Sequence, residues 1–244
     1  MFVNSLRMSL MKKATLKRMR RAWCAGALAV LVPSLASAQY VMEFAQTYNA
    51  PASNFISSTF LNQQALINAT KPGAPQAARQ QLALASPQVA RSAAELAQAA
   101  PAAQRARLEK VYVQLMPGYH QLEQKLGWPA DDVAGAMAAL LAGNYMAMTG
   151  NELSDASVTA AGNQLRASAS VQNLLNQLST ADRRRLYEQC AMLGTFMALA
   201  NKTSQQQPAN VVANLRQSAR ENLRVVLGDA ADTLRFTAQG MELR

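Results

Sequence analysis

Helix-forming residues dominate the chain after residue 38, where alanine, glutamine and leucine recur and alternating runs of β-branched residues are nearly absent. This composition favours helix in almost every segment, because these side chains lose little conformational freedom in a helix. We therefore predict an all-α fold, a single compact bundle of about six to seven helices. The 206 residues after position 38 are enough for one substantial core.

The first 38 residues have the pattern of an export signal. Six Lys and Arg residues between positions 12 and 21 precede the apolar run WCAGALAVLVPSL, and Ala36-Ser37-Ala38 follows as a cleavage site. The run of 13 residues is shorter than the roughly 20 that span a bilayer. We predict cleavage after Ala38, release to the periplasm or the medium, and no transmembrane anchor; Met11 gives a more ordinary signal length than Met1.

Removal of the signal changes the electrostatic interpretation. Residues 1–38 hold seven of the 24 Lys and Arg residues and none of the 14 Asp and Glu residues, so the formal charge falls from +10 to +3. Nucleic-acid binding needs a concentrated basic face in the mature domain. The overall charge therefore gives no support for a nucleic-acid partner.

Proline, glycine and serine divide the remaining chain. We predict a polar lead and loosely packed helices over residues 39–100, and a core helical domain over residues 101–244. Expected breaks lie at residues 71–75, at Pro117-Gly118 and at Gly127, which is placed as a helix-terminating glycine. Helices are expected to start at Pro101, near Asp131-Asp132, at Ser154, at Ser170, at Ser179 and at Pro208, and the last 13 residues are expected to be less helical.

The expected helix over residues 130–149 carries small residues at intervals of four. Gly135, Ala139 and Gly143 form a ridge without bulky side chains, which lets a second helix approach closely. The strictly apolar part of this helix is too short to span a membrane. We predict a buried helix, with Asp131 and Asp132 in its first turn, where carboxylates complement the helix dipole.

The stretch DRRRLYEQCAMLGTFMALANK begins at Asp182 and is expected to lie on one helix of about twenty residues. Ser179 and Asp182 form a variant of the capping box, in which aspartate replaces the usual glutamate. Leu186, Cys190, Leu193 and Met197 recur at helical spacing, and other apolar residues predict burial on more than one side. Cys190 is therefore expected to be a buried core residue.

Cys190 and His120 are the sole cysteine and histidine after residue 38. One of each, far apart in sequence, does not compose a zinc cluster or a histidine-rich metal site, and there is neither a GxSxG motif nor a glycine-rich phosphate loop. We predict no cofactor and no metal. His120 is expected to have an ordinary surface or hydrogen-bonding role.

Carboxylates are the remaining candidates for catalysis, as in glycoside hydrolases. Capping explains Asp131 and Asp132, whereas Glu109 and Glu123 have the pattern of exposed helix charges beside lysines. Glu188 is the least explained. It is expected to form a salt bridge with Arg184 one turn earlier, and a fold contact or a role as an acid are the alternatives.

Two groups of arginines are candidates for binding an anion or a partner. Arg183, Arg184 and Arg185 lie in the first turn of a helix, where cations oppose the dipole. Arg216, Arg220 and Arg224 recur every four residues and form one ridge. If the two helices lie side by side, these six side chains make an anion-binding patch; a solvated face is the alternative.

Several segments together resemble a known family. They are Gly127-Trp128, Asp132-Val133-Ala134, Asn144-Tyr145, Gln164-Leu165-Arg166, LSTADRRRLYEQCAMLG and LRFTAQGMEL. In order and spacing they resemble an uncharacterised family of exported proteobacterial proteins, a domain of unknown function, from about Leu108 to Leu243. The resemblance implies an exported helical domain and assigns no activity, cofactor or catalytic residue.

The favoured hypothesis is a non-enzymatic binding or interaction module of the cell envelope, with an unknown protein or envelope component as its partner. One alternative is a carboxylate-dependent peptidoglycan hydrolase. The other is a binder of anionic envelope polymers through the arginine ridges. Glu188, one turn past the first group of arginines, is included with them as a possible anion- or partner-binding residue.

Overall fold

The computed structural model describes residues 63–78 and 82–244. The described α-helices are α4 (Gln63–Ala69), α5 (Val89–Ala97), α6 (Ala102–Lys125), α7 (Val133–Thr149), α8 (Asp155–Ala167), α9 (Ala169–Gln177), α10 (Thr180–Ser204) and α11 (Ala209–Leu227). A 3-10 helix, η1 (Gly228–Thr233), leads into strands β1 (Leu234–Thr237) and β2 (Gly240–Leu243). The all-α class is confirmed, while the number of α-helices within the described ranges, eight, exceeds the number expected.

Helix α7 lies at the centre of the bundle. It packs against α8, α10 and α11, and α10 in turn packs against α5 and α6. Fourteen of the 17 residues of α7 are buried, which is the expected state of a helix that is apolar on every side. The prediction of a buried helix is therefore confirmed. Within the described ranges, no helix combines the length and apolarity that crossing a bilayer requires.

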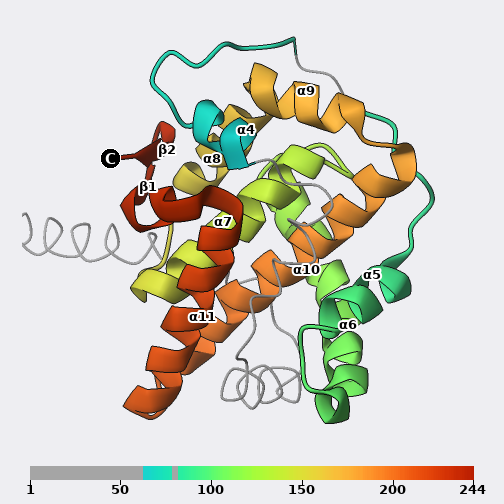
Figure 1. Ribbon diagram of the computed structural model, residues 1–244, viewed down its shortest axis with the longest axis vertical. Helices are drawn as coiled ribbons and strands as arrows, with labels where there is room; N and C mark the ends of the chain where they lie inside the picture. Colours follow the sequence, from blue (N-terminus) through green and yellow to red (C-terminus); the bar gives the residue numbers. More distant parts are fainter. Residues whose placement is uncertain (1–62, 79–81) are drawn as a thin grey trace, which may run out of the picture.

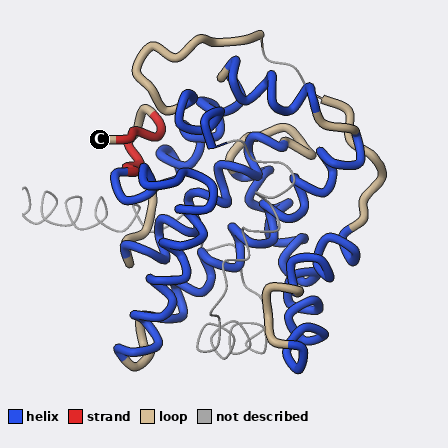
Figure 2. Tube along the Cα trace, in the orientation of Figure 1, coloured by secondary structure: helices blue, strands red, loops and turns tan. Residues whose placement is uncertain are grey.

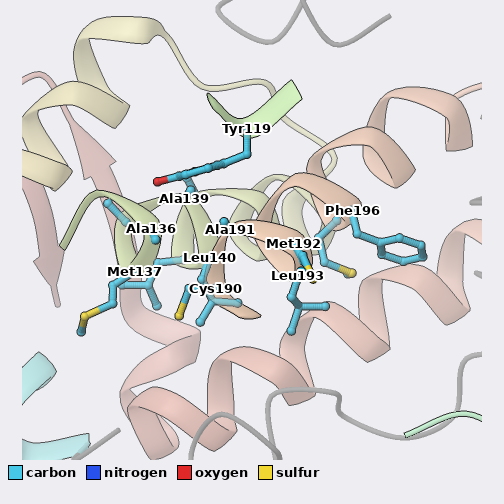
Figure 3. Close-up of a cluster of buried hydrophobic side chains, with 14 of the residues drawn as sticks. Tyr119, Ala136, Met137, Ala139, Leu140, Cys190, Ala191, Met192, Leu193 and Phe196 are labelled. Atoms are coloured by element: carbon cyan, nitrogen blue, oxygen red, sulfur yellow. The ribbon is translucent and has the colours of Figure 1, made fainter. Parts of the chain in front are cut away.

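The small-residue ridge explains how closely α7 approaches α10. A Cβ added to Gly143 would lie 2.1 Å from the backbone oxygen of Gly194, and one added to Gly194 would lie 2.5 Å from the backbone of Ala139. Figure 3 shows Leu140 of α7 beside Cys190 and Ala191 of α10 at this contact. Gly135, the third residue of the predicted ridge, faces Trp128 instead.

Helix α10 is buried continuously from Leu186 to Asn201. Ser179 caps it as predicted, since its Oγ accepts from the backbone amide of Asp182. The Asp182 carboxylate accepts from the Ser179 hydroxyl, whereas in a capping box it would accept from the Ser179 backbone amide. Cys190 is fully buried, as predicted, and burial raises the pKa of its thiol far above the ordinary value. His120 is exposed, so the two residues do not form a thiol-imidazole pair.

Two local predictions are wrong. Helix α6 runs without a break through Pro117. A proline inside a helix leaves one carbonyl without its amide partner, and here Pro117 and Val113, whose carbonyl is affected, both lie on the solvent-facing side of α6. Helix α9 is capped by Ser168, whose Oγ accepts from the amide of Val171, and not by Ser170.

The last residues form an antiparallel hairpin in which Leu234 pairs with Leu243 and Thr237 with Gly240. It lies at the edge of the bundle, where Figure 2 draws it in red. Gln164 of α8 holds it, because its side-chain amide donates to the Met241 carbonyl and accepts from the Met241 amide.

Helices α4 and α5 contribute Leu66 and Leu96 to the core. The predicted signal peptide lies outside the described residues, as does the part of the 39–100 region before Gln63. The domain boundary at residue 100 stays a prediction.

Candidate functional site

The loop between α6 and α7 is the starting point of the site. Gly127 ends α6 with a φ of 65°, a left-handed conformation that glycine adopts without strain, as predicted for a helix-terminating glycine. Trp128 then packs between two helices, because a Cβ on Gly135 of α7 or on Gly162 of α8 would lie within 2.7 Å of its ring. The two glycines let this ring anchor the loop that carries Asp131 and Asp132.

Asp132 connects the loop to α8. Its carboxylate accepts from the backbone amide of Gly135 at 3.0 Å and so caps α7. The same oxygen, Oδ2, accepts from Nε of Arg166 at 3.1 Å and also from Nη2. Helix α7 begins at Val133, so Asp132 is its N-cap residue and lies just before the first turn, in which we expected it. Its capping role is confirmed.

Asp131 connects the loop to α10. Both of its carboxylate oxygens accept from Arg184, at 2.7 and 3.1 Å, and this hydrogen bonding lowers the pKa of Asp131 below its ordinary value. The residue has a φ of 61°, uncommon outside glycine. The ion pair with Arg184 accounts for a carboxylate in this position; dipole complementarity alone, which the sequence suggested, does not.

Glu123 lies beneath the loop and is 3% exposed. Its Oε1 accepts from the Asp132 amide at 3.1 Å, and its Oε2 accepts from the Tyr187 hydroxyl at 3.1 Å. Burial raises its pKa from 4.5 to about 7, although both hydrogen bonds act in the opposite direction. The expectation of an exposed charge beside Lys125 is therefore wrong.

A cleft of about 310 Å³ opens beside these ion pairs. Its walls come from the loop, the start of α7, α8, α9 and the segment before α5. The lining residues are Leu82, Gly127, Pro129, Asp131, Asp132, Val133, Ala134, Asn163, Arg166, Gln172 and Leu175. The cleft therefore combines apolar walls with two carboxylates, one guanidinium and two side-chain amides.

The three consecutive arginines of α10 point to different partners. Arg183 donates to the carbonyls of Leu175 and Leu178 at the end of α9, where a cation complements the helix dipole. Arg185 pairs with Glu95 and with Asp182. Arg184 is buried and binds Asp131. These contacts explain why arginines are placed at the start of α10 against its dipole.

Glu188 is completely buried, and the expected salt bridge with Arg184 is wrong. Its carboxylate accepts from the backbone amide of Gln88 at 2.8 Å and from the Ser92 hydroxyl at 2.6 Å. Gln88 is the N-cap residue of α5. The start of α5 has no capping side chain of its own, and Glu188 of α10 supplies the missing hydrogen-bond acceptor. This is the fold contact that was considered as an alternative to the salt bridge.

The arginine ridge of α11 lies apart from this region. Arg220 and Arg224 both pair with Asp232 of η1, at 3.2 and 2.6 Å, and Arg216 is exposed beside Gly150. Figure 1 shows α10 and α11 diverging from the loop that joins them, so the start of α10 lies on the opposite side of the molecule from α11. The structure does not bring the two arginine groups together into one patch.

Arg166 and Gln172 are site residues that the sequence did not single out as candidates. Arg166 belongs to one of the segments that carry the family resemblance, as do Asp132 and Arg184. That is the sequence feature from which Arg166 could have been identified as a candidate. Within the described ranges, no three His, Cys, Asp or Glu side chains come together as a metal site requires.

Comparisons with known proteins identify a family but no activity. No curated protein and no solved structure matches this chain. Residues 17–244 match the sequence model of a family described as a family of unknown function, DUF6683, and this match extends well before Leu108, where the resemblance drawn from the sequence begins. Since the match covers nearly all of its length, the chain belongs to the DUF6683 family.

Proposed function

We propose that this protein is an exported, non-enzymatic binding protein of the cell envelope, and that the cleft beside Asp131 and Asp132 is its ligand site. Export rests on the signal pattern of residues 1–38, with cleavage after Ala38 and release into the periplasm or the medium. The observation that carries the binding role is the cleft itself. Its volume of about 310 Å³ lies at the lower end of the roughly 300–1,000 Å³ of small-molecule sites.

The charged groups of the cleft are held in place by the fold. Asp132 is fixed by the α7 amide and by Arg166, and Asp131 is fixed by Arg184. Groups that are already ordered lose little conformational freedom when a ligand binds, so more of the interaction energy remains as affinity. This favours a preformed binding site.

The same contacts favour binding over hydrolysis by paired carboxylates. A retaining or inverting glycosidase needs one carboxyl group that holds a proton at the substrate. Arg184 keeps the pKa of Asp131 low. Glu123 has a raised pKa, but it is 3% exposed and is not among the residues that line the cleft. The hydrolase hypothesis therefore has less support than the binding hypothesis.

Recovery of the protein from the envelope of its own host tests both parts. We expect an N-terminus at Gln39 in the periplasmic or secreted fraction, and a small molecule that mass spectrometry detects in the native protein. Leu82→Trp should remove this molecule by filling the cleft. Leu84→Trp is the matched control, because Leu84 is also half-buried but does not line the cleft.

Retention of residues 1–38 on a protein that stays in the cytosol would contradict export. A bound molecule that Leu82→Trp and Leu84→Trp retain equally would place the ligand site elsewhere.

A further inference from the structure

Arg166 fixes the orientation of a first cleft amide, that of Asn163. Its Nη1 donates to Oδ1 of Asn163 at 2.6 Å. A guanidinium donates hydrogen bonds and accepts none, so the Asn163 amide group has to present its oxygen to Arg166. The amide nitrogen, Nδ2, is therefore a donor, and Asn163 is half-exposed on the cleft wall.

Arg166 also fixes a second amide through its backbone. Gln172 donates from Nε2 to the Arg166 carbonyl at 2.9 Å. A carbonyl only accepts, so Oε1 of Gln172 is left as an acceptor. This oxygen has no hydrogen-bond partner among the described residues, and Gln172 is 5% exposed on the cleft wall. An unsatisfied buried acceptor costs about 1–3 kcal/mol, which a donor on a ligand removes.

The guanidinium and the backbone carbonyl of Arg166 thus orient one donor, on Asn163, and one acceptor, on Gln172. Apolar side chains such as Val133 and Leu175 line the same cleft. A carboxylate ligand has no donor for Gln172 and meets Asp131 and Asp132, whereas an ammonium group has no acceptor for Asn163. A secondary amide carries one donor, one acceptor and an apolar group on each side. We propose that the cleft recognises a small molecule through a secondary amide, with Asn163 donating to its carbonyl and Gln172 accepting from its N–H.

This inference rests on the proposed function, since it assigns a ligand chemistry to the same cleft. A secondary amide occurs both in N-acetylated sugars and in peptide bonds. The structure defines the shared amide chemistry, and the choice of probes separates the two sources.

The sharpest test compares N-methylacetamide with methyl acetate, which differ only in the replacement of N–H by oxygen. Binding is followed by NMR through the side-chain amide signals of Asn163 and Gln172 in the ¹⁵N-labelled chain from Gln39. We expect N-methylacetamide to shift these signals and methyl acetate to bind about tenfold more weakly or less, since each tenfold corresponds to about 1.4 kcal/mol. Equal affinity for the two probes would overturn the proposal.

Asn163→Asp provides a variant that keeps the fold. An aspartate still accepts from Arg166 but has no donor, so affinity for N-methylacetamide should fall about tenfold or more. Asn214→Asp on the exposed side of α11 makes the same change of charge and should leave affinity unaltered. Unchanged affinity in Asn163→Asp would also overturn the proposal.

Two larger probes then identify the source of the amide. N-acetylglucosamine, with glucose as its amide-free counterpart, represents sugars, and N-acetylalanine methylamide represents peptides. If either amide probe binds more tightly than N-methylacetamide, the proposal is supported and the tighter probe identifies the source of the amide. If glucose and N-acetylglucosamine bind equally and N-acetylalanine methylamide does not bind, the proposal is contradicted. If no amide probe binds while Leu82→Trp still removes a native ligand, the amide inference fails and the proposed function survives.

Discussion

Tyr187 donates a hydrogen bond of 3.1 Å to Glu123, which joins α10 to α6 inside the core. Both side chains are nearly inaccessible to solvent, and Glu123 also accepts from the backbone of Asp132 in the loop before α7. One buried carboxyl group therefore links the two long helices to the loop that carries the cleft aspartates. The protonation of this group affects all three elements.

We predict that the free energy of unfolding decreases as the pH rises from about 4.5 to about 7. The pKa of Glu123 is about 7 in the folded chain against an ordinary 4.5, so the folded state holds a proton that the unfolded state has lost in this interval. The difference of about 2.5 pKa units corresponds to at most about 3 kcal/mol. Urea unfolding at pH 5 and pH 8 measures it.

Glu123→Gln should remove most of this loss, because a neutral amide replaces the carboxyl group. Glu109→Gln on the same helix is the control, since Glu109 is half-exposed, and it should retain the pH dependence. The pH interval of this loss, from about 4.5 to about 7, lies above the pKa of Asp131, which is lowered from 3.8. The ion pair of Asp131 with Arg184 is therefore lost only in more acidic solution, below pH 3.8. Parallel pH profiles for the wild type and Glu123→Gln would refute the assignment.

A second prediction concerns the contact between α7 and α10. Gly143→Ala should lower the free energy of unfolding by about 3 kcal/mol, because the new methyl group would lie 2.1 Å from the Gly194 backbone and the helices must separate. Gly118→Ala, in a half-exposed position of α6, should be neutral or stabilising by up to about 1 kcal/mol. Thermal or urea unfolding distinguishes the two; equal stability of both variants would show that the close approach is not required.

Local features of the fold were predictable from the sequence. Helix starts at Ser154 and Ser179, a helix end at Gly127 and the end of the helix expected over residues 130–149 depend on residues within one turn, and the structure has them as predicted. The hairpin was missed because its strands have four residues each and are held by Gln164, which lies 77 residues before its partner Met241.

The candidate site was less predictable, because its contacts join distant segments. Tyr187 is 64 residues from Glu123, and Arg184 is 53 residues from Asp131. In the sequence, Glu123 is one charge beside a lysine on a helix, and nothing nearby indicates that α10 covers it. Three arginines at the start of a helix oppose its dipole, and the sequence does not show which partners compensate for this. Their partners in α9 and in the loop before α7 are brought close only by the tertiary fold.

Arg184→Lys should destabilise the fold by about 1–2 kcal/mol. The guanidinium makes two hydrogen bonds to Asp131 and donates from Nε to the Ala85 carbonyl, and a lysine does not reproduce this planar set. Arg91→Lys is the control, because the Arg91–Glu95 pair is largely exposed and such pairs contribute about 0–1 kcal/mol. Urea unfolding of both variants checks the difference, and a loss no larger in Arg184→Lys than in the control would argue against a structural role for the ion pair.

Cys190 should resist modification in the native protein. Its side chain is fully buried between α7 and α10, as Figure 3 shows, and burial raises the pKa of the thiol, so little reactive thiolate is present. In the chain from Gln39, which has no other cysteine, we expect a water-soluble disulfide reagent to react only as fast as the protein unfolds. Stopped labelling in 0 and 6 M urea, read by intact mass, measures this, and rapid labelling without urea would mean that the α7–α10 contact opens readily in the folded state.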